Sequence, residues 1–169
     1  MKGFLQIVPN LTFGDDVCRL FHGRGGLFAG DEHLCLDWYK PVLLLTSFKM
    51  LETEQLNELV IAVKVLWQQQ RPTETLNLVY QYRQGGQTFS ELLHGEVPEQ
   101  HIVIENGARF LVHLLRGQNH GLFLDMANGR AWVKQHAKHK KVLNLFAYTC
   151  GFSVVALQGG ADEVVNMDM

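Results

Sequence analysis

The C-terminal part of the chain constrains the fold more than any other. KVLNLFA (141–147) is a continuous apolar run, typical of a parallel strand that is buried on both faces. FSVVALQ (152–158) has the character of a short helix that Gly159-Gly160 ends, and EVVNM (163–167) is a second buried strand. Strand, turn, helix and strand in this order predict a βαβ unit.

A ligand site is expected at one edge of this unit. Ligands of an open parallel sheet bind beyond the carboxyl ends of its strands. The first strand leads into the loop AYTCG (147–151), and the second ends at Asp168. Asp168 follows Gly151 by 17 residues, close to the roughly 20-residue spacing at which an acidic residue accepts hydrogen bonds from ribose hydroxyls.

The loop composition bears on which ligand this edge would take. A pyrophosphate cofactor such as NAD requires G-x-G-x-x-G, so that the phosphates can approach the helix N-terminus. Here a single glycine stands beside the bulkier Tyr148 and Cys150. The spacing therefore favours an adenosyl ligand without phosphates, such as S-adenosylmethionine (SAM). The bland alternative, a βαβ unit that binds nothing, stays open at this point.

The first two thirds of the chain mix strand and helix patterns. Two strands, 33–39 and 42–48, are expected on either side of a tight turn at Pro41. A helix with Thr53 as its N-cap runs to Arg71-Pro72, since its apolar residues recur at helical spacing.

Further elements follow this helix. LNLVYQY (76–82) alternates like a strand that Gly85-Gly86 closes. A hairpin of 101–105 and 108–115 is expected around Asn106-Gly107, a pair that suits a type I′ turn. LFLD (122–125) reads as a short strand and residues 129–140 as a helix. The expected fold class is α/β: an N-terminal α+β domain (1–115), with a role in positioning substrate, and then the first βαβ unit of a Rossmann-like sheet (116–169).

Composition limits the classes of function. The net charge of −2 over 169 residues gives no whole-chain support for nucleic-acid binding. Residues 130–141, however, hold five cations, two histidines and no acid; the cations are Arg130, Lys134, Lys138, Lys140 and Lys141. This segment is either a solvated helix face or a surface that attracts RNA phosphates.

Other features point to a reduced, cytoplasmic protein without a metal centre. The three cysteines form no CxxC pair and no ligand set with the histidines. No apolar run approaches the ~18 residues of a transmembrane helix, and the first residues do not resemble a signal peptide. The sequence leaves the oligomeric state open, homo-oligomers included.

Two segments carry a resemblance to a known family. GLFLDMANGRAWV (121–133) and KVLNLFAYTCGFSVVALQGGADEVVNMDM (141–169) are similar to the bacterial 23S rRNA large-subunit methyltransferases, a family that includes cytosine-5 enzymes. RLFHGRGGLFAGDEHLCLDWY (19–39) is also similar to the segment that opens the domain before the catalytic one. The resemblance implies SAM as cofactor and RNA, specifically rRNA, as the partner whose base is methylated.

The resemblance also assigns site residues. Asp168 corresponds to the acid that binds the ribose. The first SAM motif corresponds to Asn144, Phe146, Tyr148, Thr149 and Gly151, and the segment expected to close over the cofactor to Phe123, Leu124, Asp125 and Arg130. Lys134, Lys138, Lys140 and Lys141 are the expected RNA contacts.

Two departures from the family pattern keep other functions open. Cys150 stands where the family has a second glycine, and Met126-Ala127 where it has Gln-Arg. These departures favour one alternative, an inactive RNA-binding module on the same fold. The other alternative is a nucleotide-dependent oxidoreductase on a similar sheet, and the loop without G-x-G-x-x-G argues against it. The family's catalytic thiol lies in a later segment, so the catalytic residues are expected beyond Met169 and not at Cys150. We accordingly expect a chain truncated after the second strand of the sheet, inactive by itself.

Overall fold

The computed structural model describes residues 1–168, which form two compact units. The first consists of Met1–Glu99 and Leu114–Gln118; the second consists of Gln100–His113 and of Asn119 to the end of the described chain. The boundary expected after residue 115 differs from this division, because the hairpin before it belongs to the second unit.

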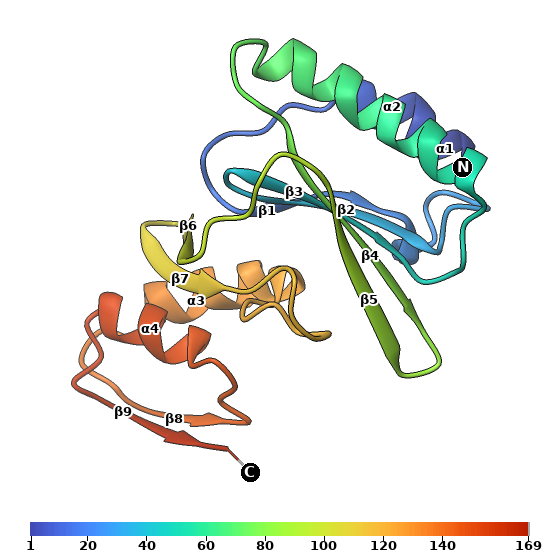
Figure 1. Ribbon diagram of the computed structural model, residues 1–169. Coiled ribbons are helices and arrows are strands. Elements are labelled where there is room, and N and C mark those ends of the chain that lie inside the picture. Colours follow the sequence, from blue (N-terminus) through green and yellow to red (C-terminus); the bar gives the residue numbers. More distant parts are fainter. Residues whose placement is uncertain (169) are drawn as a thin grey trace. The chain divides into compact units, whose positions relative to one another are not determined.

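The first unit is built on a mixed five-stranded sheet in the order β1-β2-β3-β4-β5 (Figure 1). Its strands are β1 (Cys18–His22), β2 (Leu34–Tyr39), β3 (Val42–Ser47), β4 (Asn77–Gln84) and β5 (Gln87–His94). Neighbours are antiparallel except β3 and β4, which are parallel. The helix α2 (Thr53–Gln70) connects that parallel pair, as a crossover connection must.

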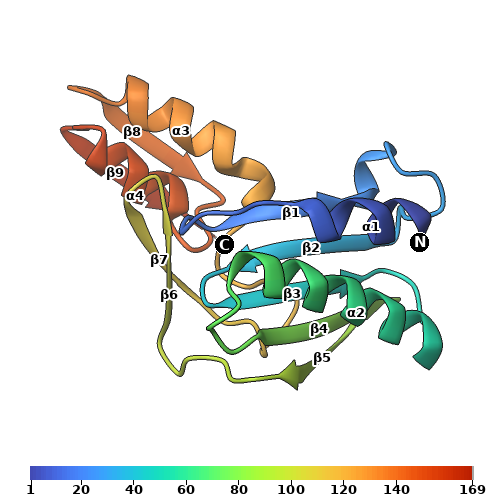
Figure 2. The same cartoon turned by 90° about the horizontal axis from the view of Figure 1, so that it is seen from above.

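Helices cover one face of this sheet. In two perpendicular views α2 and α1 (Lys2–Ile7) lie over the same face (Figures 1 and 2). Leu36, Trp38 and Leu45 of the sheet are fully buried against Leu59 and Leu66 of α2. Two short 3-10 turns, η1 (Val8–Asn10) and η2 (Gly23–Gly25), complete the unit.

The predicted elements of the first unit are confirmed, with one correction and three omissions. Strands β2, β3 and β4 and the end of α2 lie where the sequence placed them. The N-cap is Glu52 and not Thr53. The Glu52 side chain accepts a hydrogen bond from the backbone N–H of Gln55, and the backbone N–H of Glu52 donates to Gln55 Oε1 at 3.1 Å. Helix α1 and strands β1 and β5 were not predicted.

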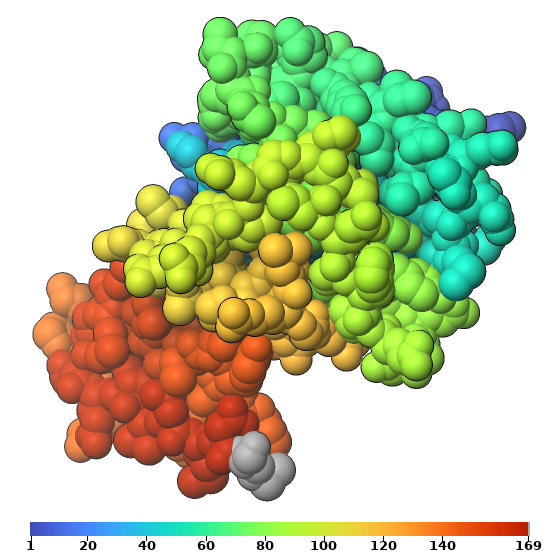
Figure 3. Space-filling view, in the orientation of Figure 1, coloured from blue at the N-terminus to red at the C-terminus, as the bar shows by residue number. Residues whose placement is uncertain are grey.

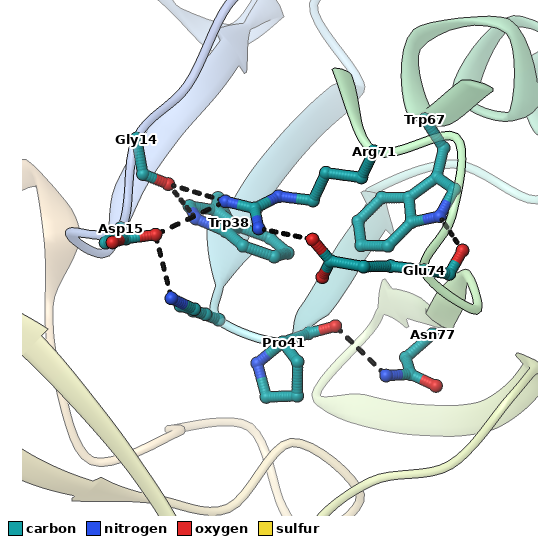
Figure 4. Close-up of polar contacts among 9 residues, drawn as sticks. Gly14, Asp15, Trp38, Pro41, Trp67, Arg71, Glu74 and Asn77 are labelled. Carbon is teal, nitrogen blue, oxygen red and sulfur yellow. Dashed lines mark hydrogen bonds and ion pairs between the residues drawn. The ribbon is translucent and has the colours of Figure 1, made fainter. Parts of the chain in front are cut away.

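A polar network fastens the N-terminal loop to the end of α2 (Figure 4). Arg71 donates to Glu74 Oε1 (2.9 Å) and to Asp15 Oδ1 (3.4 Å), and Lys40 also donates to Asp15 (2.8 Å). Trp38 Nε1 donates to the carbonyl of Gly14 at 2.9 Å. Both cations of the network, Arg71 and Lys40, are paired with carboxylates. The network therefore holds the ends of these elements together.

The second unit contains the predicted hairpin and βαβ unit. Strands β6 (His101–Glu105) and β7 (Ala108–Val112) meet at Asn106-Gly107, whose positive φ values of 48° and 77° suit a type I′ turn. Strands β8 (Lys141–Leu145) and β9 (Glu163–Met167) are parallel and joined through α4 (Gly151–Gln158). The order of elements in the βαβ prediction is confirmed. The expected burial of its two strands on both faces is wrong, because within residues 1–168 only α4 packs on them.

The segment before β8 corrects two expectations. Residues 122–125 form no strand; η3 (Leu124–Met126) is a single 3-10 turn that leads directly into α3 (Ala127–His136). The helix therefore begins earlier and ends earlier than the expected 129–140. Helices α3 and α4 approach closely at Gly159, where an added Cβ would lie 2.1 Å from the carbonyl oxygen of Lys134.

The two faces of the β8–β9 pair differ. Asn144 faces α4, since its side chain donates to Ser153 Oγ. On the other face the apolar side chains of Leu143, Leu145, Val165 and Met167 are about half exposed, and we call them the open face of β8–β9. No helix in residues 1–168 is long and apolar enough to cross a membrane.

Candidate functional site

A small pocket of about 90 Å³ lies at the carboxyl end of β8 in the second unit. Most residues expected at the cofactor site line it: Phe123, Arg130, Asn144, Phe146, Tyr148, Thr149 and Gly151. The remaining lining residues are Leu122, Met126, Ala147 and Phe152. The fold thus brings together two segments that are more than ten residues apart in the sequence, 122–130 and 144–152.

The loop between β8 and α4 has an unusual backbone. Phe146 and Cys150 adopt left-handed conformations, with φ values of 54° and 63°. Cys150 is the N-cap of α4, and its N–H donates to the carbonyl of Ala147. Glycine is the residue that favours this region of φ, which gives a physical reason for a glycine at the position of Cys150.

A hydrogen bond joins the ends of the two strands. The N–H of Ala147 donates to the carbonyl of Met167 at 3.3 Å, so the loop starts beside the end of β9. Asp168 directly follows β9 and is exposed, and the surface at this end of the second unit is visible in Figure 3. Asp168 lies outside the pocket lining but at the same edge of the sheet.

Asn144 is held in a network of polar side chains. Its Nδ2 donates to Ser153 Oγ (2.8 Å) and to Asn166 Oδ1 (3.1 Å), and Ser153 Oγ donates to the same Asn166 oxygen. Asn144 and Asn166 are register partners on the two strands, so both face α4. Sequence reasoning missed Ser153 and Asn166; a polar residue at matching positions of two apolar strands was the available signal.

Arg130 is almost completely buried and acts within the fold. Its Nε and Nη2 donate to the two carboxylate oxygens of Glu105 at 2.6 and 2.7 Å, and its Nη1 donates to the carbonyl of Phe123 at 2.8 Å. Both charged side chains are 5% exposed or less. Arg130 therefore does not belong to the exposed cationic surface in which the sequence analysis counted it.

Aromatic rings border the pocket. The rings of Phe123 and Tyr148 lie 6.0 Å apart at 59°, and Phe146 is 77% exposed. Thr149 Oγ1 donates to the carbonyl of Gly121, which ties the 121–123 segment to the loop. The arrangement offers flat, apolar surfaces of the kind on which a purine ring stacks.

Two residues of the expected closing segment lie outside the lining of the pocket. Leu124 is 7% exposed and packs inside the unit, and Asp125 is exposed on η3. Neither belongs to the lining of the pocket, whereas Met126 does.

The lysines expected to contact RNA fall into two groups. Lys134 donates to the carbonyl of Asn106 (2.7 Å), and Lys141 pairs with Glu163 (3.0 Å) on the surface. Lys138 and Lys140 are exposed and make no salt bridge within residues 1–168. The exposed Trp132 stacks on His136 nearby on α3, with ring centroids 4.2 Å apart.

Comparisons with known proteins identify the family of the chain. The family model described as S-adenosylmethionine-dependent methyltransferase matches residues 18–169. The ribosomal RNA large subunit methyltransferase I of Tolumonas auensis is 37% identical over 153 residues, which cover 89% of this chain and 38% of that protein.

Two solved structures match almost the whole chain. One is assigned as a SAM-dependent methyltransferase from Streptococcus mutans: the TM-score is 0.78 at 29% identity, over 99% of this chain and 44% of that one. The other, assigned as a methyltransferase and complexed with S-adenosylhomocysteine (SAH), has a TM-score of 0.77 at 29% identity with the same coverage. The chain thus spans less than half the length of these relatives.

Proposed function

The chain belongs to the S-adenosylmethionine-dependent methyltransferase family, and on that premise we propose that it serves SAM-dependent methylation of an rRNA base. One observation carries the proposal: the pocket at the carboxyl end of β8 collects residues from both segments that resemble the family's SAM site. The named relatives supply the substrate class, since the T. auensis protein is a ribosomal RNA methyltransferase. Cytosine carbon 5 is the target atom that the resemblance implies, and the cytoplasm is the place where such a substrate is found.

The residues present fit SAM in part. Ligand pockets usually enclose about 300 Å³ or more, whereas this pocket encloses about 90 Å³. It is therefore large enough for one portion of the ligand. The rest would lie along the strand ends, with the Asp168 carboxylate as acceptor for ribose hydroxyls and the rings of Phe123, Phe146 and Tyr148 as apolar walls.

Each side chain has a defined role in this proposal. SAM, when bound, supplies an electrophilic methyl group on its sulfonium. The protein contributes alignment, since an in-line displacement depends on proximity and orientation. Thr149 joins the loop to the 121–123 segment through the carbonyl of Gly121, and Arg130 braces that segment through the carbonyl of Phe123. Asn144 keeps the strand end in register with α4.

The RNA would meet the second unit along the surface of Lys138 and Lys140. Both ammonium groups are exposed, and they follow the stacked Trp132–His136 pair on α3. Exposed cations beside a flat ring are suited to a phosphate backbone and an unpaired base.

A second candidate function is an inactive RNA-binding module. Met126 favours it, because this apolar side chain lines the pocket where the family has a polar one. The family's arginine corresponds to the next residue, Ala127, and the loss of this cation would weaken the interaction with an anionic group of the ligand or the substrate.

Calorimetric titration of the 169-residue chain tests the cofactor. We expect heat of binding with SAM and SAH and none with NAD, and Asp168→Ala should weaken SAH binding about tenfold through removal of the ribose acceptor. Asp125→Ala, also an exposed acid near the pocket, is the control and should bind SAH like the wild type. Heat with NAD but not with SAM or SAH would overturn the proposal.

A further inference from the structure

A second cationic site lies in the first unit. In the sequence its residues are well separated from the segments that form the proposed cofactor site. The second site is formed by Arg19 on β1, Arg24 on η2, Phe48 after β3 and Arg83 on β4, and we call it the Phe48 surface. Arg19 stands opposite Asp37 in the β1–β2 pair, and Asp37 points away from the core that Leu36 and Trp38 enter. The site therefore lies on the face of the sheet opposite to α2.

The charges of this surface do not balance. Arg19 holds Asp37 with two hydrogen bonds, from Nε at 2.8 Å and from Nη2 at 3.2 Å. This buried carboxylate is thereby neutralised, and Arg19 Nη1 lies 3.5 Å from His22 Nδ1. Arg24 and Arg83 make no salt bridge within residues 1–168, so two cations remain over.

Both of these arginines lie against one aromatic ring. The guanidinium carbon of Arg24 is 4.1 Å from the centroid of Phe48, and that of Arg83 is 5.9 Å away. A ring face attracts a cation without occupying its N–H donors. Among the hydrogen bonds seen within residues 1–168, Arg83 donates from Nε to Gln81 Oε1. This bond does not involve the two terminal nitrogens of the Arg83 guanidinium. A pair of such nitrogens has the geometry that matches a phosphate group.

The environment of Arg83 adds to the demand for an anion. Burial lowers the pKa of Arg83; the nearby Tyr39, Asp37 and Cys35 act in the opposite direction without cancelling this effect, and the charge of Arg19 adds to it. An anion beside a partly desolvated cation is bound more strongly than one in bulk water. Arg24 is exposed, so a ligand can reach the Phe48 surface from solvent.

We propose that the Phe48 surface binds phosphodiester groups of the RNA substrate, as a second contact separate from Lys138 and Lys140. The inference rests on the proposed function for the identity of the polyanion. Two unpaired guanidiniums on one ring recognise the backbone without reading the sequence. An acidic protein segment is the competing ligand that the same charges could attract, and it is one arm of the test.

The experiment measures RNA binding by the 169-residue chain. A fluorescein-labelled single-stranded oligoribonucleotide is titrated with wild type, R24A/R83A and K2A/K64A, with the anisotropy as readout. The control removes two exposed cations from the same unit, at Lys2 and Lys64. We expect at least a tenfold loss of affinity for R24A/R83A and less than a threefold loss for K2A/K64A.

Salt dependence gives a second readout. For single-stranded RNA the slope of log K against log salt falls by about 0.7 for each phosphate that the protein no longer neutralises. R24A/R83A removes two cations and should therefore flatten the slope by about 1.4. Equal losses of affinity in the two variants would overturn the inference. It would also be overturned if R24A/R83A lost binding of poly-glutamate but kept binding of RNA.

A parallel SAH titration separates this inference from the proposed function. R24A/R83A should bind SAH like the wild type, which also reports that the second unit is folded. RNA binding through the two arginines without any SAH binding would overturn the proposed function and leave this surface standing. If the chain binds SAH and its RNA binding does not depend on the two arginines, this inference is overturned and the proposed function stands.

Discussion

Cys150 shows at the level of one residue how a departure from a family pattern becomes visible as backbone strain. A non-glycine residue in the left-handed region costs about 1–2 kcal/mol relative to its ordinary conformations, and Cys150 has a φ of 63° at the N-cap of α4. The sequence marked the position as unusual, and the structure supplies the reason.

Cys150→Gly should stabilise the protein by about 1 kcal/mol. Urea unfolding monitored by circular dichroism measures it as a higher midpoint with an unchanged slope. Leu157→Gly is the matched control, because Leu157 is exposed within α4 and glycine there should cost about 1 kcal/mol. Two destabilised variants would contradict the strain at Cys150.

The Glu105–Arg130 pair is the charged contact on which the pocket most depends. Glu105→Gln leaves the buried guanidinium without its counter-charge, at a cost of about 3–5 kcal/mol. The exposed pair of Lys141 and Glu163 supplies the control, since Glu163→Gln should cost less than about 1 kcal/mol. Thermal unfolding of the two variants compares them, and similar losses would show that the Arg130 pair has no special weight.

At the level of elements, predictability followed the strength of the local pattern. Asn106-Gly107 predicted its hairpin correctly, and the apolar run at 141–147 predicted β8, because turn chemistry and a continuous apolar run leave few alternatives. The expected strand at 122–125 was wrong, since four apolar and acidic residues without a pairing partner can equally form a 3-10 turn.

The sequence predicted the loop that lines the pocket at the end of β8 but not the contacts that hold this loop in place. The motif located Tyr148, Thr149 and Gly151, and these do line the pocket. The partner of Arg130 could not be predicted, because Glu105 lies 25 residues away on a hairpin whose packing only the folded chain defines. Tertiary ion pairs of this kind leave no periodic signal in a sequence.

Strands β8 and β9 should exchange their amide hydrogens much faster than β2 and β3. All six residues of β3 are buried and the strand is flanked on both sides, whereas β8 has one partner within residues 1–168 and the open face beside it. Hydrogen exchange followed by mass spectrometry compares the corresponding peptides. Equal protection in the two regions would contradict the expectation.

At the level of the whole molecule, the two units differ in how much core supports them. The first contains a cluster of fully buried residues from α1, α2 and the sheet, while the second keeps apolar strands half exposed. Separate units of unequal stability need not unfold together.

Differential scanning calorimetry should accordingly show two transitions. SAH should raise only the lower one, because the pocket lies entirely in the second unit and binding stabilises the state that binds. At a ligand concentration 100 times the Kd the gain is about 2.7 kcal/mol. A single transition that SAH does not shift would contradict this division, and NAD serves as the control ligand.

The path of the chain between the units has a practical consequence for dissecting the protein. Residues 114–118 return to the first unit after the hairpin, and there the carbonyl of Gly117 accepts a hydrogen bond from buried Gln81. A gene fragment that stops at Glu99 would lack this acceptor, and one that starts at Gln100 would carry five residues whose neighbours are missing. Neither unit can be excised intact by a single cut, so loop deletion or circular permutation is the route to studying them apart.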